Sequence, residues 1–222
     1  MFKVRFEKLT MLQSQAELEQ AFRTDRVCLA PDSSVAFEGD VSLAPEVMLV
    51  GQCRFSGPIQ IDQGCILTNV QLGRGNIVRA YSILTDTSAG DRNLFGPFCF
   101  IRDNCVVADD CILGAHVEAA RSTFGSGIKI SHRAFVGDAK LGEQTIIGAG
   151  VVFCNYDGSG RQPTQIGPRV TVGSGTLLVP PLTIGADSII AAGSTVTKDV
   201  PAGAKLIQKR AAQAGPAGYS GR

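Results

Sequence analysis

Aliphatic side chains recur at every sixth position over most of this chain, beginning near Phe37. The most regular run is the set Ile166, Val172, Leu178, Ile184, Ile190 and Val196. Four residues after each comes a second inward candidate, small or medium in size: Val170, Thr176, Leu182, Ser188, Ser194 and Val200. An interval of six does not match the helical period of about 3.6 residues, whereas short strands separated by turns can produce it. The pattern therefore predicts a chain of many short, similar β-strands.

Three such strands with their turns make one coil of about 18 residues, and roughly nine coils fit between residues 37 and 200. Successive coils stack through parallel pairing at ~4.8 Å, so the aliphatic residues form ladders in the core. We predict an all-β parallel β-helix over residues 37–201. The preceding segment, residues 1–36, contains a predicted short helix over 13–23. Residues 202–222 are predicted to form a tail.

The cysteines follow the same period. Five of the seven occupy the small-residue position of the repeat: Cys53, Cys65, Cys99, Cys105 and Cys111. Cysteine behaves as a small hydrophobe, and these spacings are not those of a metal site, so we expect packing residues and no metal. The odd number and the absence of a C-x-x-C motif favour reduced thiols and a cytoplasmic setting over a disulfide framework.

Composition narrows the class of protein further. Apolar residues make up 44% of the chain, charged residues 18%, and the net charge is +1. These values are typical of a folded protein and do not favour nucleic acid as a partner. We expect no membrane span, because no window has about 18 uninterrupted apolar residues. The N-terminus lacks the apolar core of a signal peptide.

Candidate chemistry gathers in residues 130–157. This stretch holds His132, one of only two histidines, and ends at the polar sequence CNYDG. Residues 154–165 interrupt the repeat, and interruptions of a solenoid are typically loops on the binding side. The other histidine, His116, is expected to be a packing or rim residue.

The segments HRAFVGDAKLGEQTIIGAGVVFCNYDG and IGPRVTVGSGTLLVPPLTIGADSIIAAGSTVTKDV resemble a known family. It is the C-terminal acetyltransferase domain of the bifunctional N-acetylglucosamine-1-phosphate uridyltransferase/glucosamine-1-phosphate acetyltransferase. The resemblance covers about residues 37–200, and GPFCFIRD and GAHVE fall in matching places. It implies a left-handed β-helix, although the general rule on crossovers would have favoured the right hand.

The resemblance also implies an activity: acetyl transfer from acetyl-CoA to an amino sugar phosphate or a nucleotide sugar. His132 matches the general base, since a neutral imidazole with a pKa of about 6.5 can accept a proton at neutral pH. The implied substrate-binding residues are Arg102, Glu118, Arg121, Asn155, Tyr156 and Arg161. The implied cosubstrate-binding residues are Gly148, Ala149, Ser174 and Ala192. Amide groups such as those of Gly148 or Gly150 are candidates for binding the oxyanion. A homotrimer with shared active sites is implied.

The acceptor end departs from the family pattern. The family's phosphate-binding lysine falls on Ala120, its sugar-binding tyrosine on Phe135 and its sugar-binding asparagine on Ile146. A lysine of the inserted loop is replaced by Arg161. Arg121 and Arg161 are candidates to supply the missing positive charge.

Two other functions stay open. A non-catalytic β-helix used for assembly or regulation is favoured by the lost sugar-binding residues and opposed by the retention of His132 and the CNYDG loop. A zinc carbonic anhydrase on the same scaffold needs three histidine ligands, and the chain has two. The sequence does not identify the acceptor or decide between N- and O-acylation.

Overall fold

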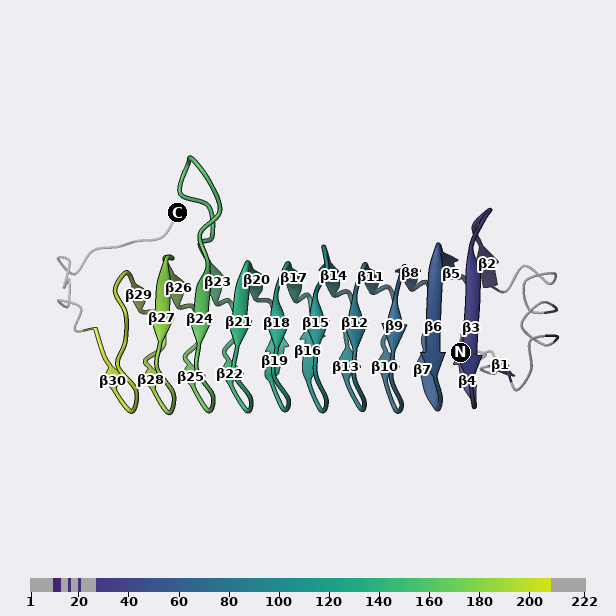
Figure 1. The fold of residues 1–222 in the computed structure, drawn as a ribbon. Coiled ribbons are helices and arrows are strands. Elements are labelled where there is room, and N and C mark those ends of the chain that lie inside the picture. Colours follow the sequence, from purple (N-terminus) through teal and green to yellow (C-terminus); the bar gives the residue numbers. More distant parts are fainter. Residues whose placement is uncertain (1–9, 13–15, 17–19, 21–26, 209–222) are drawn as a thin grey trace, which may run out of the picture.

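The chain winds through three sheets that form the faces of a straight prism (Figure 1). The computed structural model describes residues 10–12, 16, 20 and 27–208. The helix predicted over 13–23 lies almost wholly outside these residues. The predicted fold class is confirmed: the protein is an all-β parallel solenoid, consistent with a left-handed β-helix. The boundaries predicted at residues 36 and 201 stay predictions.

The first sheet has 11 strands. All neighbours pair in parallel except β1, which is antiparallel to β4. In sheet order the strands are β1 (Thr10–Leu12), β4 (Val41–Leu43), β7 (Ile59–Ile61), β10 (Ile77–Val78), β13 (Leu94–Phe95), β16 (Ile112–Ala115), β19 (Lys129–His132), β22 (Ile146–Ile147), β25 (Thr171–Val172), β28 (Ile189–Ile190) and β30 (Lys205–Leu206).

The second sheet has 10 strands and is the face that carries most of the candidate site. In sheet order they are β2 (Val27–Leu29), β5 (Val47–Val50), β8 (Ile66–Thr68), β11 (Ile83–Thr85), β14 (Phe100–Arg102), β17 (Glu118–Ala120), β20 (Phe135–Gly137), β23 (Val152–Phe153), β26 (Leu177–Leu178) and β29 (Thr195–Val196).

The third sheet has nine strands. From the N-terminal end they are β3 (Ser34–Glu38), β6 (Gln52–Ser56), β9 (Gln71–Leu72), β12 (Ser88–Ala89), β15 (Val106–Val107), β18 (Thr123–Phe124), β21 (Ala139–Leu141), β24 (Thr164–Ile166) and β27 (Leu182–Ile184).

Most coils differ in length by no more than a single residue, and this explains why the sequence repeat slips. Phe100 pairs with Glu118, and Glu118 pairs with Phe135, so the second of these two coils is shorter by one position. The coil from Val152 to its partner Leu177 is the long exception, because it contains the inserted loop. Short strands at a constant parallel spacing thus absorb the difference in their turns.

The predicted ladders form the core. Every member of the aliphatic run from Ile166 to Val196 is buried, and so is every member of the smaller set from Val170 to Val200. The five repeat cysteines are at most 2% exposed. Burial raises the pKa of the Cys65 thiol to about 11, so it remains a neutral packing group. The packing role expected for these cysteines is confirmed.

Polar side chains at the same inward position bond to the turns. Asn76 Nδ2 donates to the carbonyl oxygens of Gly73 and Gly90, each at 2.7 Å. Asn93 N donates in turn to Asn76 Oδ1 at 3.0 Å. Strand pairing leaves some turn carbonyls without a donor, and these buried side-chain amides donate to them.

Each coil turns three corners, which we call first (from the first to the second sheet), second (second to third) and third (third to first). Non-glycine residues at all three corners adopt a positive φ, as at His116 (56°), Asp103 (58°) and Asp110 (60°). This backbone is unfavourable in isolation, and hydrogen bonds between stacked corners hold it here, such as Arg121 N to the Arg102 carbonyl at 3.3 Å. Stacking therefore places one residue per coil in a column along each corner.

The part of the chain that the structure describes contains no helix long and apolar enough to cross a membrane.

Candidate active site

The outer face of the second sheet brings predicted acceptor-binding residues into register. Phe100, Glu118 and Phe135 are paired neighbours in β14, β17 and β20, and Val152 of β23 continues the row. An open hollow of about 560 Å³ lies over this row. It is lined by His116, Glu118, Arg133, Ala134, Phe135 and Val152.

A second row on the same face loses side-chain bulk from one coil to the next. Arg102 pairs with Ala120, and Ala120 pairs with Gly137. A Cβ on Gly137 would lie 2.5 Å from Asn155 Nδ2 and 2.8 Å from the ring of Phe135. The small residues therefore make room for these two side chains, and no cation occupies the position where the family has its lysine.

The two arginines beside this face are tied to the same carboxylate. Arg102 donates from Nη2 to Glu118 Oε1 at 2.7 Å and from Nη1 to Asp103 Oδ2. Arg121 Nη1 donates to that same Asp103 oxygen at 2.6 Å. The bond to Glu118 is the main reason why the pKa of Arg102 lies above its ordinary value. Asp103 thus links two neighbouring coils.

Asp138 extends this network by one more coil. Arg121 grips it with two bonds, Nε to Oδ1 at 2.7 Å and Nη2 to Oδ2 at 3.1 Å. Asn155 Nδ2 also donates to Asp138 Oδ2. Partial burial works to raise the pKa of Asp138, but the bonds from Arg121 and Asn155 outweigh it, and the pKa lies below its usual range. We call Arg102, Asp103, Glu118, Arg121, Asp138 and Asn155 the charge network.

Asp103 and Asp138 were missed from the sequence, although a signal was present. Each step along the series Asp103, Arg121, Asp138 and Asn155 is the length of one coil. Residues one coil apart stack at a corner, so this spacing places all four in a column.

The predicted loop residues lie on an excursion that stands out from the prism between β23 and β24 (Figure 1). Tyr156 is 65% exposed and forms an isolated antiparallel bridge with Arg161. Asp157 closes the loop by accepting bonds from the backbone N–H groups of Ser159 and Gly160, each at 2.8 Å. These bonds hold the pKa of Asp157 well below its usual range. Tyr156 and Arg161 do not line the hollow.

The predicted base and cosubstrate positions share a column at the first corner. His132 pairs with Ala115 of the preceding coil. On either side of the next corner Lys129 pairs with Ile146 and Phe135 pairs with Val152, and the same offset places Ala149 beside His132. Gly175 N to the Ala149 carbonyl and Gly193 N to the Ser174 carbonyl, at 2.8 and 2.7 Å, continue the column. We call His132, Ala149, Ser174 and Ala192 the acetyl column; all four are exposed.

The backbone N–H groups beside this column differ in whether they already donate a hydrogen bond. Gly148 N donates to the Val172 carbonyl and Gly150 N to the Arg133 carbonyl, each at 2.8 Å. Both amides suggested from the sequence as oxyanion donors are therefore engaged, and that suggestion is corrected. Ala149 N, between them, donates no hydrogen bond to any described residue.

The two histidines have different surroundings. His116 lies at the rim of the hollow and stacks on Phe98 with centroids 5.3 Å apart, and Phe98 stacks on Tyr81 at 5.7 Å. The His132 imidazole has no hydrogen bond or ion pair with any described residue. Ile146 is 44% exposed on the first sheet and does not line the hollow. Over the described ranges, no group of three or more His, Cys, Asp or Glu is arranged to hold a metal ion.

Comparison with known proteins finds the same six-residue repeat in other proteins. The model of the family described as bacterial transferase hexapeptide (six repeats) matches residues 163–198. A solved UDP-N-acetylglucosamine acyltransferase from Bacteroides fragilis aligns with 79% of this chain and 68% of its own, at 16% identity and a TM-score of 0.44.

The relatives in sequence are bifunctional proteins. The chain is 38% identical to the bifunctional protein GlmU of Acinetobacter baumannii over 180 residues, which is 81% of this chain and 39% of that protein. It is 35% identical to the GlmU of Synechococcus elongatus over 201 residues, 88% of this chain and 44% of that protein. The resemblance to hexapeptide-repeat acyltransferases is thus confirmed, while the chain spans less than half the length of these relatives.

Proposed function

We propose that this protein transfers the acetyl group of acetyl-CoA to the amino group of a sugar carried as a phosphate or as a nucleotide derivative. The observation that carries the proposal is the acetyl column: His132 is followed along the first corner by Ala149, Ser174 and Ala192, one residue per coil, beside a hollow that borders the charge network. Thioester aminolysis needs a base and an accessible surface beside it for the thioester, and the exposed small residues of the acetyl column leave such a surface.

In the proposed reaction the acceptor nitrogen attacks the thioester carbonyl while the His132 imidazole takes a proton from that nitrogen. The Ala149 N–H, which bonds to no described residue, is the donor that we propose for the oxyanion of the tetrahedral intermediate. Collapse of the intermediate breaks the carbon–sulfur bond, and the imidazolium returns the proton to the departing thiolate. The products are an amide and free CoA.

Acceptor positioning falls to the opposite side of the hollow. Glu118 lines the hollow and belongs to the charge network, so it links both ends of the proposed site. The remaining proposed acceptor contacts are Arg102, Arg121, Asn155, Tyr156 and Arg161. Tyr156 and Arg161 are on the projecting loop, from which they can reach a neighbouring subunit.

A homotrimer with shared sites is part of the proposal. It is supported by the exposed apolar stack of Tyr81 and Phe98, about half exposed each, which continues the rim of the hollow. Such exposed apolar surfaces typically mark contacts with other proteins. Light scattering on the purified chain tests the trimer. A cytoplasmic setting is supported by the seven free cysteines.

The decisive experiment follows free thiol release from acetyl-CoA with a panel of amino sugar phosphates and nucleotide-linked amino sugars. We expect His132→Ala to lower turnover by about 10²–10⁴-fold, the usual contribution of a general base. Asp110→Asn, at the third corner and away from the hollow, is the control and should retain most activity. A His132→Ala variant as active as the native protein would refute the assigned base.

A non-catalytic role remains the second candidate because Ala120, Phe135 and Ile146 replace sugar-binding residues of the family. It predicts no turnover and no thermal stabilisation by acetyl-CoA. A bound cosubstrate at 100 times its Kd should stabilise the native state by about 2.7 kcal/mol. Absence of both responses would favour the non-catalytic role.

A further inference from the structure

We propose that Asp103 is a specificity-determining residue that keeps a phosphomonoester out of the acceptor end of the site. The inference rests on the acetyl-transfer function proposed above and narrows its acceptor. Of the two acceptor classes, it selects the nucleotide-linked amino sugar, in which every phosphate is esterified or bridged on two sides. A sugar monophosphate carries a terminal dianion instead.

The first argument is the balance of charge. The network contains two guanidinium groups, those of Arg102 and Arg121, against the three carboxylates of Asp103, Glu118 and Asp138. Its net charge is therefore negative. A dianion placed there meets repulsion that two paired arginines do not offset.

The second argument is the occupancy of the donors. A phosphate binds arginine through two parallel N–H groups, and it needs those groups free. Arg121 uses Nε and Nη2 on Asp138 and Nη1 on Asp103. Arg102 donates one Nη1 hydrogen to Asp103 and one Nη2 hydrogen to Glu118, so the edge formed by its two Nη groups is divided between two carboxylates. Its Nε is buried without a partner in the described chain, out of reach of a ligand.

Asp103 is the residue on which both arginines depend. One of its oxygens accepts from Arg102 and from Arg121, so removing this single charge would release one N–H donor on each arginine. The two released groups belong to neighbouring coils of the second sheet and its corner. No other carboxylate of the network bonds to both arginines.

Nearby cations do not restore a dianion site. Ala120 supplies none at the position beside Arg102. Arg161 acts electrostatically on Asp138, where it helps to lower the pKa. Arg133 lines the hollow at the first corner, on the side of the acetyl column, and its single charge matches one diester phosphate. The charge pattern thus fits a diester better than a monoester.

The test compares equilibrium binding of glucosamine-1-phosphate and of glucosamine, the same sugar with and without the monoester. Calorimetry on the full chain and on Asp103→Asn measures the ratio of the two Kd values. Asparagine tolerates the positive φ of position 103 and keeps its shape, so the variant should fold. We expect the native protein to bind the phosphate no more tightly than the free sugar, and Asp103→Asn to shift the ratio toward the phosphate by about tenfold.

The matched control is Asp110→Asn. Asp110 has the same positive φ and accepts two bonds from Arg92, each at 2.7 Å, but lies at the third corner, away from the hollow. This variant should leave the ratio unchanged. A native preference for the phosphate of tenfold or more, or no shift in Asp103→Asn, would overturn the proposal. If the native protein binds neither sugar measurably, appearance of phosphate binding in Asp103→Asn supports the proposal and its non-appearance overturns it.

Turnover separates this proposal from the function on which it rests. Because the ratio is an equilibrium measurement, it stands even if no acceptor is acetylated. If turnover occurs, kcat/KM should be higher for a nucleotide-linked amino sugar than for the matching sugar-1-phosphate. Turnover with the opposite preference would sink the specificity assignment while leaving acetyl transfer intact.

Discussion

The first and second corners of the solenoid flank the same sheet, yet they carry different kinds of side chain. Along the first corner the acetyl column presents small side chains and backbone groups next to one imidazole. Along the second corner, the charge network joins five ionised side chains and one amide across four coils. The backbone is alike at both, since each corner residue turns the chain with a positive φ.

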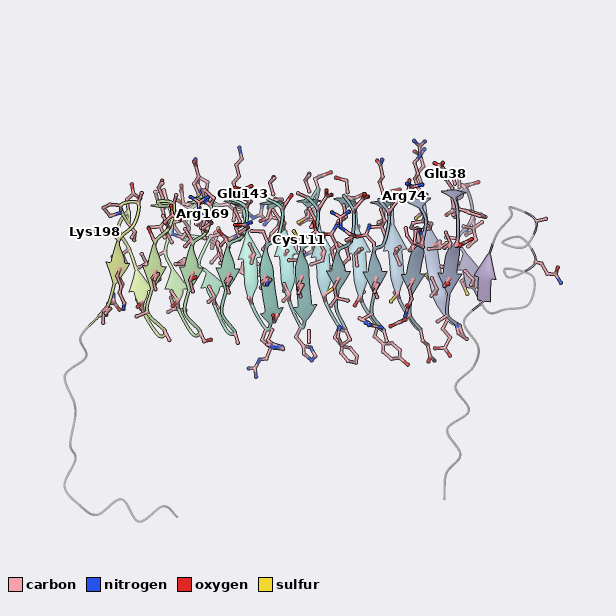
Figure 2. All side chains as sticks on the ribbon, turned by 90° about the horizontal axis from the view of Figure 1, so that it is seen from below. Glu38, Arg74, Cys111, Glu143, Arg169 and Lys198 are labelled. Carbon is pink, nitrogen blue, oxygen red and sulfur yellow. The ribbon has the colours of Figure 1, made fainter. Side chains whose placement is uncertain are left out.

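This difference teaches how a repeat scaffold can vary one end of a site without the other. A column of small residues stays open as long as no bulky side chain is introduced. A charge network depends on every partner, because losing one leaves another uncompensated. The third corner also carries a charged column: Arg169 lies between Glu143 and Asp187, and Figure 2 labels Arg169 and Glu143.

Among changes that distinguish the two corners, the largest effect should come from adding bulk to the acetyl column. Ala192→Trp places an indole on the acetyl column, and we expect kcat/KM for acetyl-CoA to fall by about 100-fold because the thioester loses its alignment. Ala186→Trp is the control, since Ala186 and Ala192 each cover a glycine of the preceding coil but lie at different corners. Equal losses in both variants would mean that the acetyl column does not bind the cosubstrate.

Disrupting the charge network should lower the free energy of unfolding. Asp138→Ala leaves the partly buried Arg121 and the Asn155 amide without their shared acceptor. We expect the free energy of unfolding to fall by about 1–3 kcal/mol, measured by urea denaturation. Asp187→Ala is the control, because Asp187 also has a positive φ but bonds only in the exposed pair with Arg169, and it should lower stability less. Similar losses in the two variants would contradict a special role for the network.

The same network should carry a pH dependence. The pKa of Asp138 is depressed in the folded protein, so its contribution is fully present above the unfolded value of about 3.9 and is lost as pH falls through the lower folded value. The stability difference between the native protein and Asp138→Asn should therefore be constant near neutrality and shrink below about pH 4. Urea titrations at several pH values measure this, and a difference that grows on acidification would contradict it.

The smallest effect should come from the loop. Asp157→Ala removes the acceptor that closes residues 156–161, and we expect KM for the acceptor to rise about fivefold, the equivalent of about 1 kcal/mol. KM for acetyl-CoA should not change, because we propose that the loop contacts the acceptor. A rise in both values would place the loop beside the cosubstrate as well.

Much of the fold was predictable because it is local. The six-residue period depends on side chains that lie within one coil, and the burial of Ile166, Val172 and Cys111 follows from it. The site was predictable only in part. Resemblance pointed to Arg102, Glu118, Arg121 and Asn155 of the charge network but not to Asp103 and Asp138. The proposed oxyanion donor is Ala149 instead of Gly148 or Gly150, because those two amides are used in coil-to-coil bonds.

The sequence by itself determined the coil, the inward ladders and the positions at which each coil turns, since these depend on spacing along the chain. Only the tertiary structure decided which residues meet. Longer and shorter coils follow one another without a rule visible in the pattern, and each change of length moves the next corner by one position. That stacking register decides whether Asp103 contacts one arginine or two. It therefore also decides which charged groups meet in the proposed acceptor site.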